Sequence, residues 1–122
     1  MFLEIEHVQL AMPPGKEHEA RKFYVSVLGF VEVPKPENLA LRGGCWFEHG
    51  SVRVHLGVQS DFIPATKAHP AFVVKCLKTI RSELDCAGVT CSDDEPLKGF
   101  DRTYVNDPFG NRIELMERNQ IG

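Results

Sequence analysis

Residues 106–117 have the sequence NDPFGNRIELME, and this stretch decides the fold that we expect. Asp107 and Pro108 predict a turn, because proline fixes φ and an aspartate side chain can accept a hydrogen bond from the nearby backbone. Gly110 and Asn111 follow as residues that tolerate positive φ at the end of a turn. The turn therefore leads into a new element that begins at Arg112.

The residues after this turn alternate in polarity, as expected for a β-strand. Ile113 and Leu115 lie on one face, and the other face carries Arg112, Glu114 and Met116. Glu114 is thus a carboxylate in the middle of a strand between apolar neighbours, where an unpaired buried charge is unfavourable. An arginine partner, exposure to solvent or a bound metal ion would each account for it.

The pattern Asp-Pro-x-Gly-Asn-Arg-Ile-Glu-Leu resembles the closing strand of the glyoxalase/bleomycin-resistance/extradiol-dioxygenase proteins, the vicinal oxygen chelate superfamily. In that superfamily the glutamate at the position of Glu114 is usually a metal ligand. The contexts around His7 (His-Val) and His69 (His-x-Ala-Phe) also match. The resemblance therefore extends over nearly the whole chain, from His7 to Glu117.

The composition is that of a soluble globular protein, with 122 residues, 43% hydrophobic and 25% charged, and a net charge of −3. No basic surface is indicated, so nucleic acid and anionic membranes are not expected as partners. No apolar run approaches the roughly 18 residues of a membrane span, and the first residues lack the basic segment of a signal peptide. The four cysteines form no CxxC motif, and we interpret them as reduced thiols of a cytoplasmic protein.

The first half of the chain predicts a strand, a helix and three further strands. Residues 4–11 alternate, with His7 on the more polar face, and residues 16–28 carry apolar residues at helical spacing up to a glycine. A short strand is predicted at 30–33, with a few more extended residues at 39–42. A hairpin over 45–58 then turns at His49-Gly50, and His55 lies opposite the aliphatic face of its second strand.

After a linker at 59–68, the second half repeats this order, with a strand, a helix and three strands predicted at 69–74, 77–87, 89–91, 102–105 and 112–117. The separation from Gly29 to His55 equals that from Gly88 to Glu114, so the halves repeat in pattern. We expect an α+β protein of two βαβββ modules, about 1–60 and 66–122, that form a single vicinal oxygen chelate domain over 1–122. The resemblance implies sheets curled into a cup with the helices outside.

The repeat places His7 and His69 on the first strands of the modules, and His55 and Glu114 on the last. These donors suit Zn²⁺, Ni²⁺, Fe²⁺, Co²⁺ or Mn²⁺, and the resemblance implies that all four could bind one divalent ion. The alternative for each histidine is an ordinary hydrogen-bonded residue; it is strongest for His55, where many members of the superfamily have no ligand. Glu114 is the candidate catalytic base, and His55 is either a fourth ligand or an acid–base residue beside the metal.

Further candidates for a substrate pocket follow from the alternation of the predicted strands, and they are Arg53, Trp46, Arg102, Tyr104, Arg112 and Met116. An arginine could orient an anionic or oxygen-rich substrate, but arginines in strands also pair with acids or face solvent. Trp46 could line a pocket or belong to the core.

The resemblance implies one of three functions. The first is a divalent-metal-dependent, glyoxalase-like lyase or isomerase that chelates a small oxygen-rich metabolite and stabilises an oxyanion. The second is a related metalloenzyme, an extradiol dioxygenase or a thiol transferase. The third is a metal-free protein that binds a small molecule or an antibiotic, like the bleomycin-resistance proteins. The partner is a small molecule in each case, and by analogy we expect a homodimer.

Overall fold

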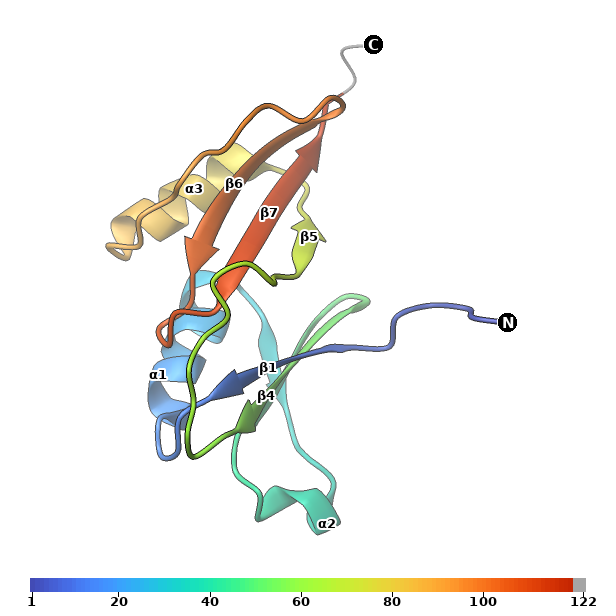
Figure 1. Ribbon diagram of the computed structural model, residues 1–122, viewed down its shortest axis with the longest axis vertical. Coiled ribbons are helices and arrows are strands. Elements are labelled where there is room, and N and C mark those ends of the chain that lie inside the picture. Colours follow the sequence, from blue (N-terminus) through green and yellow to red (C-terminus); the bar gives the residue numbers. More distant parts are fainter. Residues whose placement is uncertain (120–122) are drawn as a thin grey trace. The chain divides into compact units, whose positions relative to one another are not determined.

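The computed structural model of the chain describes residues 1–119 (Figure 1). The chain divides into two compact units, Met1–Ile63 and Pro64–Gly122. Each unit combines helical segments with one mixed β-sheet, so the expected α+β class is confirmed. Among the described residues, no helix has both the length and the apolar character needed to span a bilayer. The union of the two modules in one domain stays a prediction.

The first unit contains a four-stranded sheet with the strand order β1-β4-β3-β2. β1 runs parallel to β4, and the other two pairs are antiparallel. In chain order the elements are β1 (Val8–Met12), α1 (Glu17–Arg21), the π-helix η1 (Lys22–Val27), β2 (Val31–Val33), α2 (Glu37–Ala40), β3 (Cys45–His49) and β4 (Val52–Val58). This unit therefore has the predicted strand, helix and three strands.

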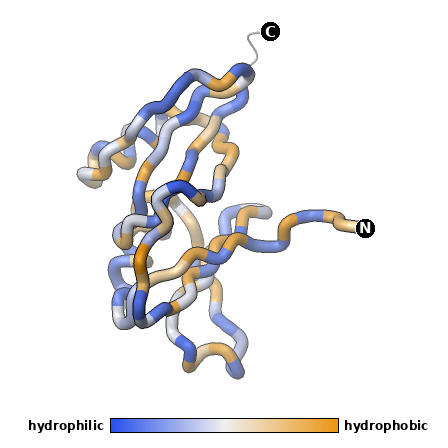
Figure 2. Tube along the Cα trace, in the orientation of Figure 1, coloured by the Kyte–Doolittle hydropathy of each residue, from blue (hydrophilic) through white to orange (hydrophobic). Residues whose placement is uncertain are grey.

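The core of the first unit lies between its helical segment and one face of the sheet. The fully buried ring of Tyr24 stacks on Phe47 of β3, with ring centroids 5.1 Å apart. Val54 and Leu56 of β4 are buried on the same face as Phe47. Hydrophobic and hydrophilic residues alternate along the strands (Figure 2), and His55 consequently lies on the opposite, polar face, as predicted.

The π-helix accounts for a core residue that helical spacing does not predict. The spacing predicts Ala20, Phe23, Val27 and Leu28 as core residues; the first two are buried and the last two half-buried, but Tyr24 is buried as well. The backbone N–H of Leu28 donates to the carbonyl of Phe23 at 3.0 Å, five residues earlier. Because this wider turn has more residues than an α-helical turn, adjacent residues can both contact the sheet.

The second unit contains a three-stranded sheet with the order β5-β7-β6, built from β5 (Ala71–Val73), α3 (Leu77–Cys86), β6 (Phe100–Asn106) and β7 (Arg112–Arg118). The predicted turn before β7 forms around Asp107, whose Oδ1 accepts hydrogen bonds from the backbone N–H groups of Phe109 and Asn111, each at 2.9 Å. Gly110 has a φ of 89°, but no non-glycine residue of the described chain has positive φ. Asn111 instead donates its side-chain amide to Asp107.

Helix α3 covers one face of the second sheet (Figure 1). Leu77 and Leu84 of α3 are buried, and the backbone N–H of Leu77 donates to Oε1 of Glu117 on β7 at 2.6 Å. Ile113 and Leu115 share this face of β7 with Glu117. The face away from the helix therefore carries the predicted set Arg112, Glu114 and Met116.

Two segment predictions are wrong. Residues 89–91 were expected to form a strand, but the described chain has there only an isolated bridge between Ser92 and Tyr104. Residues 39–42 were expected to be extended, but they lie at the end of α2 and in the turn after it. Pro36 immediately precedes α2, and the fixed φ of proline is compatible with the start of a helix.

Two of the predicted metal donors lie just before strands rather than within them. β1 begins at Val8 and β5 begins at Ala71, so His7 and His69 precede their strands. Before β5, the carbonyl of Pro70 accepts a hydrogen bond from the N–H of Glu114 at 3.0 Å. Proline has no N–H to return, which ends the ladder at this point.

Candidate functional site

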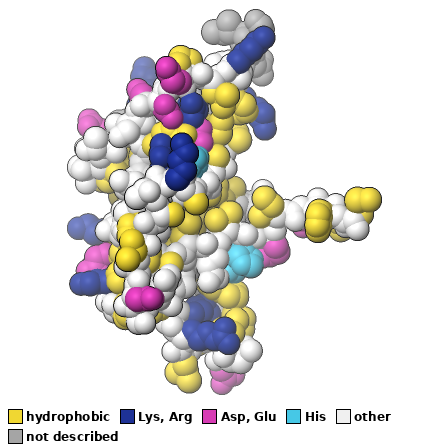
Figure 3. All heavy atoms as spheres, in the orientation of Figure 1, with side chains coloured by type: hydrophobic (Ala, Val, Ile, Leu, Met, Phe, Trp, Pro, Cys, Tyr) yellow, Lys and Arg dark blue, Asp and Glu magenta, His cyan; other side chains and the backbone are white. Residues whose placement is uncertain are grey.

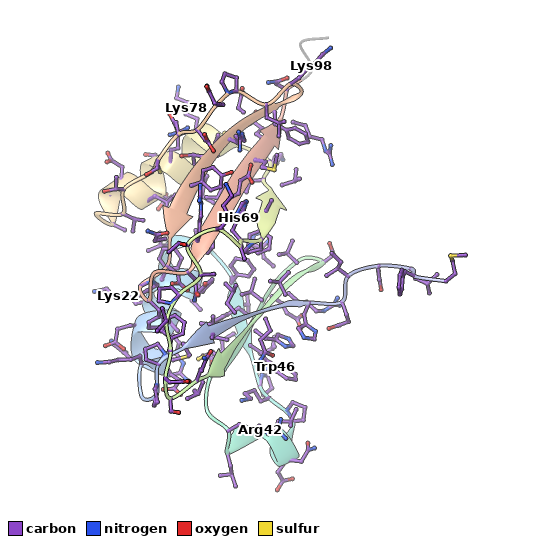
Figure 4. The ribbon with its side chains drawn as sticks, viewed as in Figure 1. Lys22, Arg42, Trp46, His69, Lys78 and Lys98 are labelled. Atoms are coloured by element: carbon purple, nitrogen blue, oxygen red, sulfur yellow. The ribbon has the colours of Figure 1, made fainter. Side chains whose placement is uncertain are left out.

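His69 and Glu114 form the central contact of the second unit. His69 precedes β5 (Figure 4), Glu114 lies in the middle of β7, and His69 Nε2 is 2.9 Å from Glu114 Oε1. Glu114 is only 6% exposed. The parallel pairing of β5 with β7, in which Ala71 lies beside Glu114, brings the two side chains together.

This contact requires a proton. His69 Nδ1 lies 2.9 Å from the carbonyl oxygen of Lys67, and a carbonyl oxygen only accepts, so Nδ1 carries hydrogen. Nε2 then faces a carboxylate oxygen, which also only accepts unless it is protonated. One proton, on the imidazole or on the carboxyl group, therefore lies between His69 and Glu114. A divalent cation bound to both groups would take the place of this proton.

Arg102 pairs with the second oxygen of Glu114. Its Nη1 donates to Glu114 Oε2 at 3.2 Å and to Tyr104 Oη at 2.8 Å. Its Nη2 donates to the backbone carbonyl of Glu95. In the β6–β7 ladder Tyr104 lies opposite Glu114, and Arg102 lies opposite Met116, which is also buried. The buried carboxylate thus has an arginine partner, one of the three explanations considered for it.

Arg112 and Tyr104 extend this cluster along the sheet. The guanidinium carbon of Arg112 lies 4.0 Å from the centroid of the Tyr104 ring, and Nη1 of Arg112 donates to the carbonyl oxygen of Thr66 at 3.2 Å. The ring of His69 packs edge-on against the same tyrosine, with centroids 5.1 Å apart. Tyr104 therefore connects the His69–Glu114 pair with Arg112.

Three aromatic rings stack on the polar face of the first unit. His55 lies between Trp46 and His7, with centroids 4.0 Å from each ring and interplanar angles of 4° and 16°. Trp46, labelled in Figure 4, is opposite His55 in the β3–β4 ladder and belongs to this polar face. Burial, followed by the neighbouring His7, lowers the pKa of His55. Its ring is therefore neutral at pH 7, and within the described chain its nitrogens have no hydrogen-bond partner.

Arg53 is paired with acids. Its Nε lies 3.4 Å from Oε2 of Glu6 and 3.8 Å from Oε2 of Glu48. Glu6 also holds His7, whose Nδ1 lies 2.9 Å from Glu6 Oε1. Arg53 thus stabilises the surroundings of the ring stack, and its charge is balanced.

Sequence reasoning placed Glu48 and Gln9 on this face without including them in the site, and it missed Glu6. Gln9 packs across Gly57, where a Cβ atom would lie only 2.6 Å from Gln9 Nε2. The alternation of residues 4–11 already places Gln9 on the face of His7, and this signal could have identified it. The partners of Arg53 depend on the register of β3 with β4, in which Glu48 lies opposite Arg53.

The predicted donors occur as two pairs, His69 with Glu114 and His7 with His55. Within either unit of the described chain, no group of three or more His, Cys, Asp or Glu side chains is placed to hold a metal ion. The donor types of both pairs suit a divalent transition metal. His69 and Glu114 already share one proton, which a metal ion bound to both would replace. The ring nitrogens of His55 have no hydrogen-bond partner in the described chain. The donor types of the two pairs are therefore compatible with such an ion.

No family model matches the chain. Among solved structures, a Bacillus anthracis protein assigned to the glyoxalase family is 48% identical, with a TM-score of 0.94, and the match covers 98% of each chain. This chain belongs to the glyoxalase (vicinal oxygen chelate) superfamily. The protein Glyoxylase I 4 of Arabidopsis thaliana is 28% identical over 108 residues; the match covers 80% of this chain, which spans 62% of the length of that relative.

The glyoxalase fold predicted from the sequence is therefore confirmed. A glyoxalase/dioxygenase from Nostoc punctiforme has the same fold, with 18% identity and a TM-score of 0.78 over 96% of this chain and 92% of that one. Membership of the glyoxalase superfamily does not select a reaction, because one fold can carry several chemistries. The reaction has to be argued from the residues of the site.

Proposed function

We propose that the protein is a divalent-metal-dependent enzyme of glyoxalase type that acts on a small oxygen-rich metabolite. The observation that carries this proposal is the contact between His69 Nε2 and Glu114 Oε1 at 2.9 Å. Two side chains of the types that bind metals, one before β5 and one on β7, are thus oriented toward one position.

His69 and Glu114 are the proposed metal-binding pair of the second unit. The carbonyl of Lys67 orients the imidazole through Nδ1, an arrangement typical of metal-binding histidines. We also propose that His7 and His55 supply donors, as the sequence predicts. When bound, the metal would act as a Lewis acid that stabilises an oxyanion formed on the substrate.

Glu114 is the proposed acid–base residue. Its two oxygens have different partners, because Oε2 accepts from Arg102 and Oε1 shares a proton with His69. Arg102 donates to Oε2, while the hydrogen bond with His69 is made at Oε1. This division allows one carboxyl group to accept or return a proton while Arg102 keeps it in place.

One observation favours the metal-free binding protein as a second candidate. Arg102 and His69 together satisfy both oxygens of Glu114 without any metal. The dioxygenase alternative differs from both, since it needs a redox-active metal and O₂.

Turnover assays test these alternatives. The protein would be loaded in turn with Zn²⁺, Ni²⁺, Co²⁺, Mn²⁺ and Fe²⁺ and assayed with hemithioacetals, α-hydroxycarbonyl compounds and catechols, with and without O₂. The proposal expects metal-dependent, O₂-independent turnover that Glu114→Gln abolishes and Glu117→Gln retains, since Glu117 lies on the other face of β7. Turnover that requires O₂ would favour the dioxygenase, and turnover unaffected by Glu114→Gln would contradict the proposed site.

We also propose that the protein is a homodimer. At the N-terminus the apolar side chains are almost fully exposed (Figure 3), and these are Met1, Phe2, Leu3 and Ile5. Clusters of exposed apolar side chains commonly mark protein interfaces. Sedimentation of the full chain and of a Phe2→Ser, Ile5→Ser variant tests this. A monomeric mass for the unmodified protein would contradict it.

A further inference from the structure

A cavity of about 370 Å³ lies in the second unit beside the His69–Glu114 pair. Its volume is within the range of small-molecule sites. Its polar lining comes from the segment before β5, the segment after α3, and strands β6 and β7, namely Thr66, Thr90, Ser92, Tyr104, Asn106 and Arg112. Tyr104 contacts His69, so the cavity and the donor pair share a wall.

Arg112 is the charged group of this cavity, and its charge is not balanced by an acid. Among the described residues no carboxylate lies within ion-pair distance of it, and no acidic side chain lines the cavity. Its contacts are the Tyr104 ring and the carbonyl of Thr66, and the latter uses a single N–H of Nη1. A guanidinium has five N–H donors, so most of those of Arg112 are available to a ligand.

Arg102 differs from Arg112 in how its charge and its N–H donors are used. Arg102 lies on the same face of the sheet, but it donates to Glu114, to Tyr104 and to the carbonyl of Glu95. Its charge is paired with Glu114 and both of its Nη atoms donate within the protein, although its buried Nε has no partner in the described chain. Arg112 is instead held by stacking on Tyr104, which positions a guanidinium without neutralising it.

The hydroxyl groups of the lining are also available. In the described chain, the side-chain hydroxyls of Thr66, Thr90 and Ser92 have no hydrogen-bond partner within the protein. Each hydroxyl can donate one hydrogen bond. The cavity thus combines one unpaired cation with several neutral donors and contains no anion, which is the composition of an oxyanion-binding site.

We propose that this cavity binds the oxyanion group, carboxylate or phosphate, of a small anionic ligand, with Arg112 as its main contact. This proposal deepens the proposed function. It rests on that function in one respect, namely that the bound ligand would be the substrate. The proposed substrates are therefore metabolites with two features. One is an anionic group that binds Arg112, and the other is a set of neighbouring oxygens that face His69 and Glu114. Arg112 would then determine specificity, while His69 and Glu114 serve the reaction.

The test is titration of the metal-free protein with inorganic phosphate and with malonate at constant ionic strength, followed by the amide NMR shifts of the cavity residues. Wild type is compared with Arg112→Gln and with a matched control, Arg118→Gln. Arg118 is an exposed arginine on the same strand whose guanidinium carbon lies 5.3 Å from the centroid of the Phe100 ring, outside the cavity.

We expect saturable shifts around Ser92 and Arg112 in wild type and Arg118→Gln, and binding weaker by about tenfold or more in Arg112→Gln. Tighter binding of phosphate identifies phosphorylated ligands, and tighter binding of malonate identifies carboxylates. Absence of saturable binding, or equal weakening in both variants, would overturn the proposal. If Arg112→Gln does not fold, Arg112→Lys gives the same comparison with a smaller loss. Because no metal is present, this result is independent of the test of metal binding.

Discussion

Nε2 of His69 and Oε1 of Glu114 lie 2.9 Å apart and hold one proton between them. A metal ion that binds both groups must displace this proton. We therefore predict that binding of Zn²⁺ releases about one proton per ion at this pair, and that affinity weakens as the pH falls. Calorimetric titrations in buffers of different ionisation enthalpy measure the proton count directly.

The control for this first prediction is the Glu114→Gln variant, in which an amide replaces the carboxylate and can donate to His69. Its binding should be weaker, with a changed proton count. Proton release that is absent in wild type, or identical in the variant, would show that the ion binds elsewhere.

His55 provides a prediction about the pH dependence of stability. Its burial against Trp46 and the nearby His7 lower its pKa below the ordinary value of 6.5. Below about pH 6.5 the unfolded chain therefore takes up a proton that the folded protein does not, and the free energy of unfolding decreases until the pH falls below the folded pKa. Urea unfolding of the metal-free protein at pH 8 and pH 5 should show this loss.

The variant His55→Phe keeps a ring in the stack but cannot titrate, so its loss of stability toward acid should be smaller. His18→Phe, at an exposed position of α1, should behave like wild type. If both variants lose as much stability as wild type, His55 is not the group responsible.

Gly44 and Gly50 allow a prediction about the backbone around β3 and β4. Both have positive φ, but a Cβ at Gly44 would lie 2.0 Å from the carbonyl oxygen of Leu56, whereas a Cβ at Gly50 would have no atom within 4 Å. Gly50→Ala should cost about 1 kcal/mol of unfolding free energy, from backbone strain alone. Gly44→Ala should cost about 3 kcal/mol or more, because β4 must also shift. Equal costs in denaturant unfolding would contradict this account of β4 next to His55.

The cysteines should differ in reactivity. Burial raises the pKa of the Cys45 thiol to about 11, whereas the hydroxyl of Thr79, which donates to Sγ at 3.1 Å, lowers the pKa of the exposed Cys76 thiol. The thiolate is the reactive form. In the folded protein iodoacetamide should therefore modify Cys76 first and Cys45 last, as followed by peptide mass spectrometry. Thr79→Val should slow the labelling of Cys76 and leave the labelling rate of Cys86 unchanged. Rapid labelling of Cys45 in the folded protein would contradict its burial.

Features that depend on local periodicity could be predicted from the sequence. The alternation of β4 and β7 places His55 and Glu114 opposite the aliphatic residues, because side chains on a strand alternate whatever the neighbouring strands do. The glycine after each helix and the turn around Asp107 follow from equally local rules. These features sufficed for the fold, which the 48% identical structure confirms.

Features that depend on pairing between distant segments could not be predicted. The acids that hold Arg53 follow from the register of β3 with β4 and from the position of Glu6. The burial of Tyr24 follows from a π-helix, which an α-helical period does not represent. The role of Arg102 as the partner of Glu114, in contrast to the unpaired Arg112, required side-chain positions on two strands.

The measurement that tests the central claim most directly is the metal content of untagged wild type, Glu114→Ala and Glu117→Ala by elemental analysis after reconstitution with Zn²⁺, Ni²⁺, Co²⁺, Fe²⁺ or Mn²⁺. Both glutamates lie on β7, but only Glu114 faces His69. We predict about one equivalent of metal in wild type and Glu117→Ala, and about tenfold less in Glu114→Ala. Wild type that stays empty with every metal, or Glu114→Ala that retains a full equivalent, would contradict the metal-dependent function.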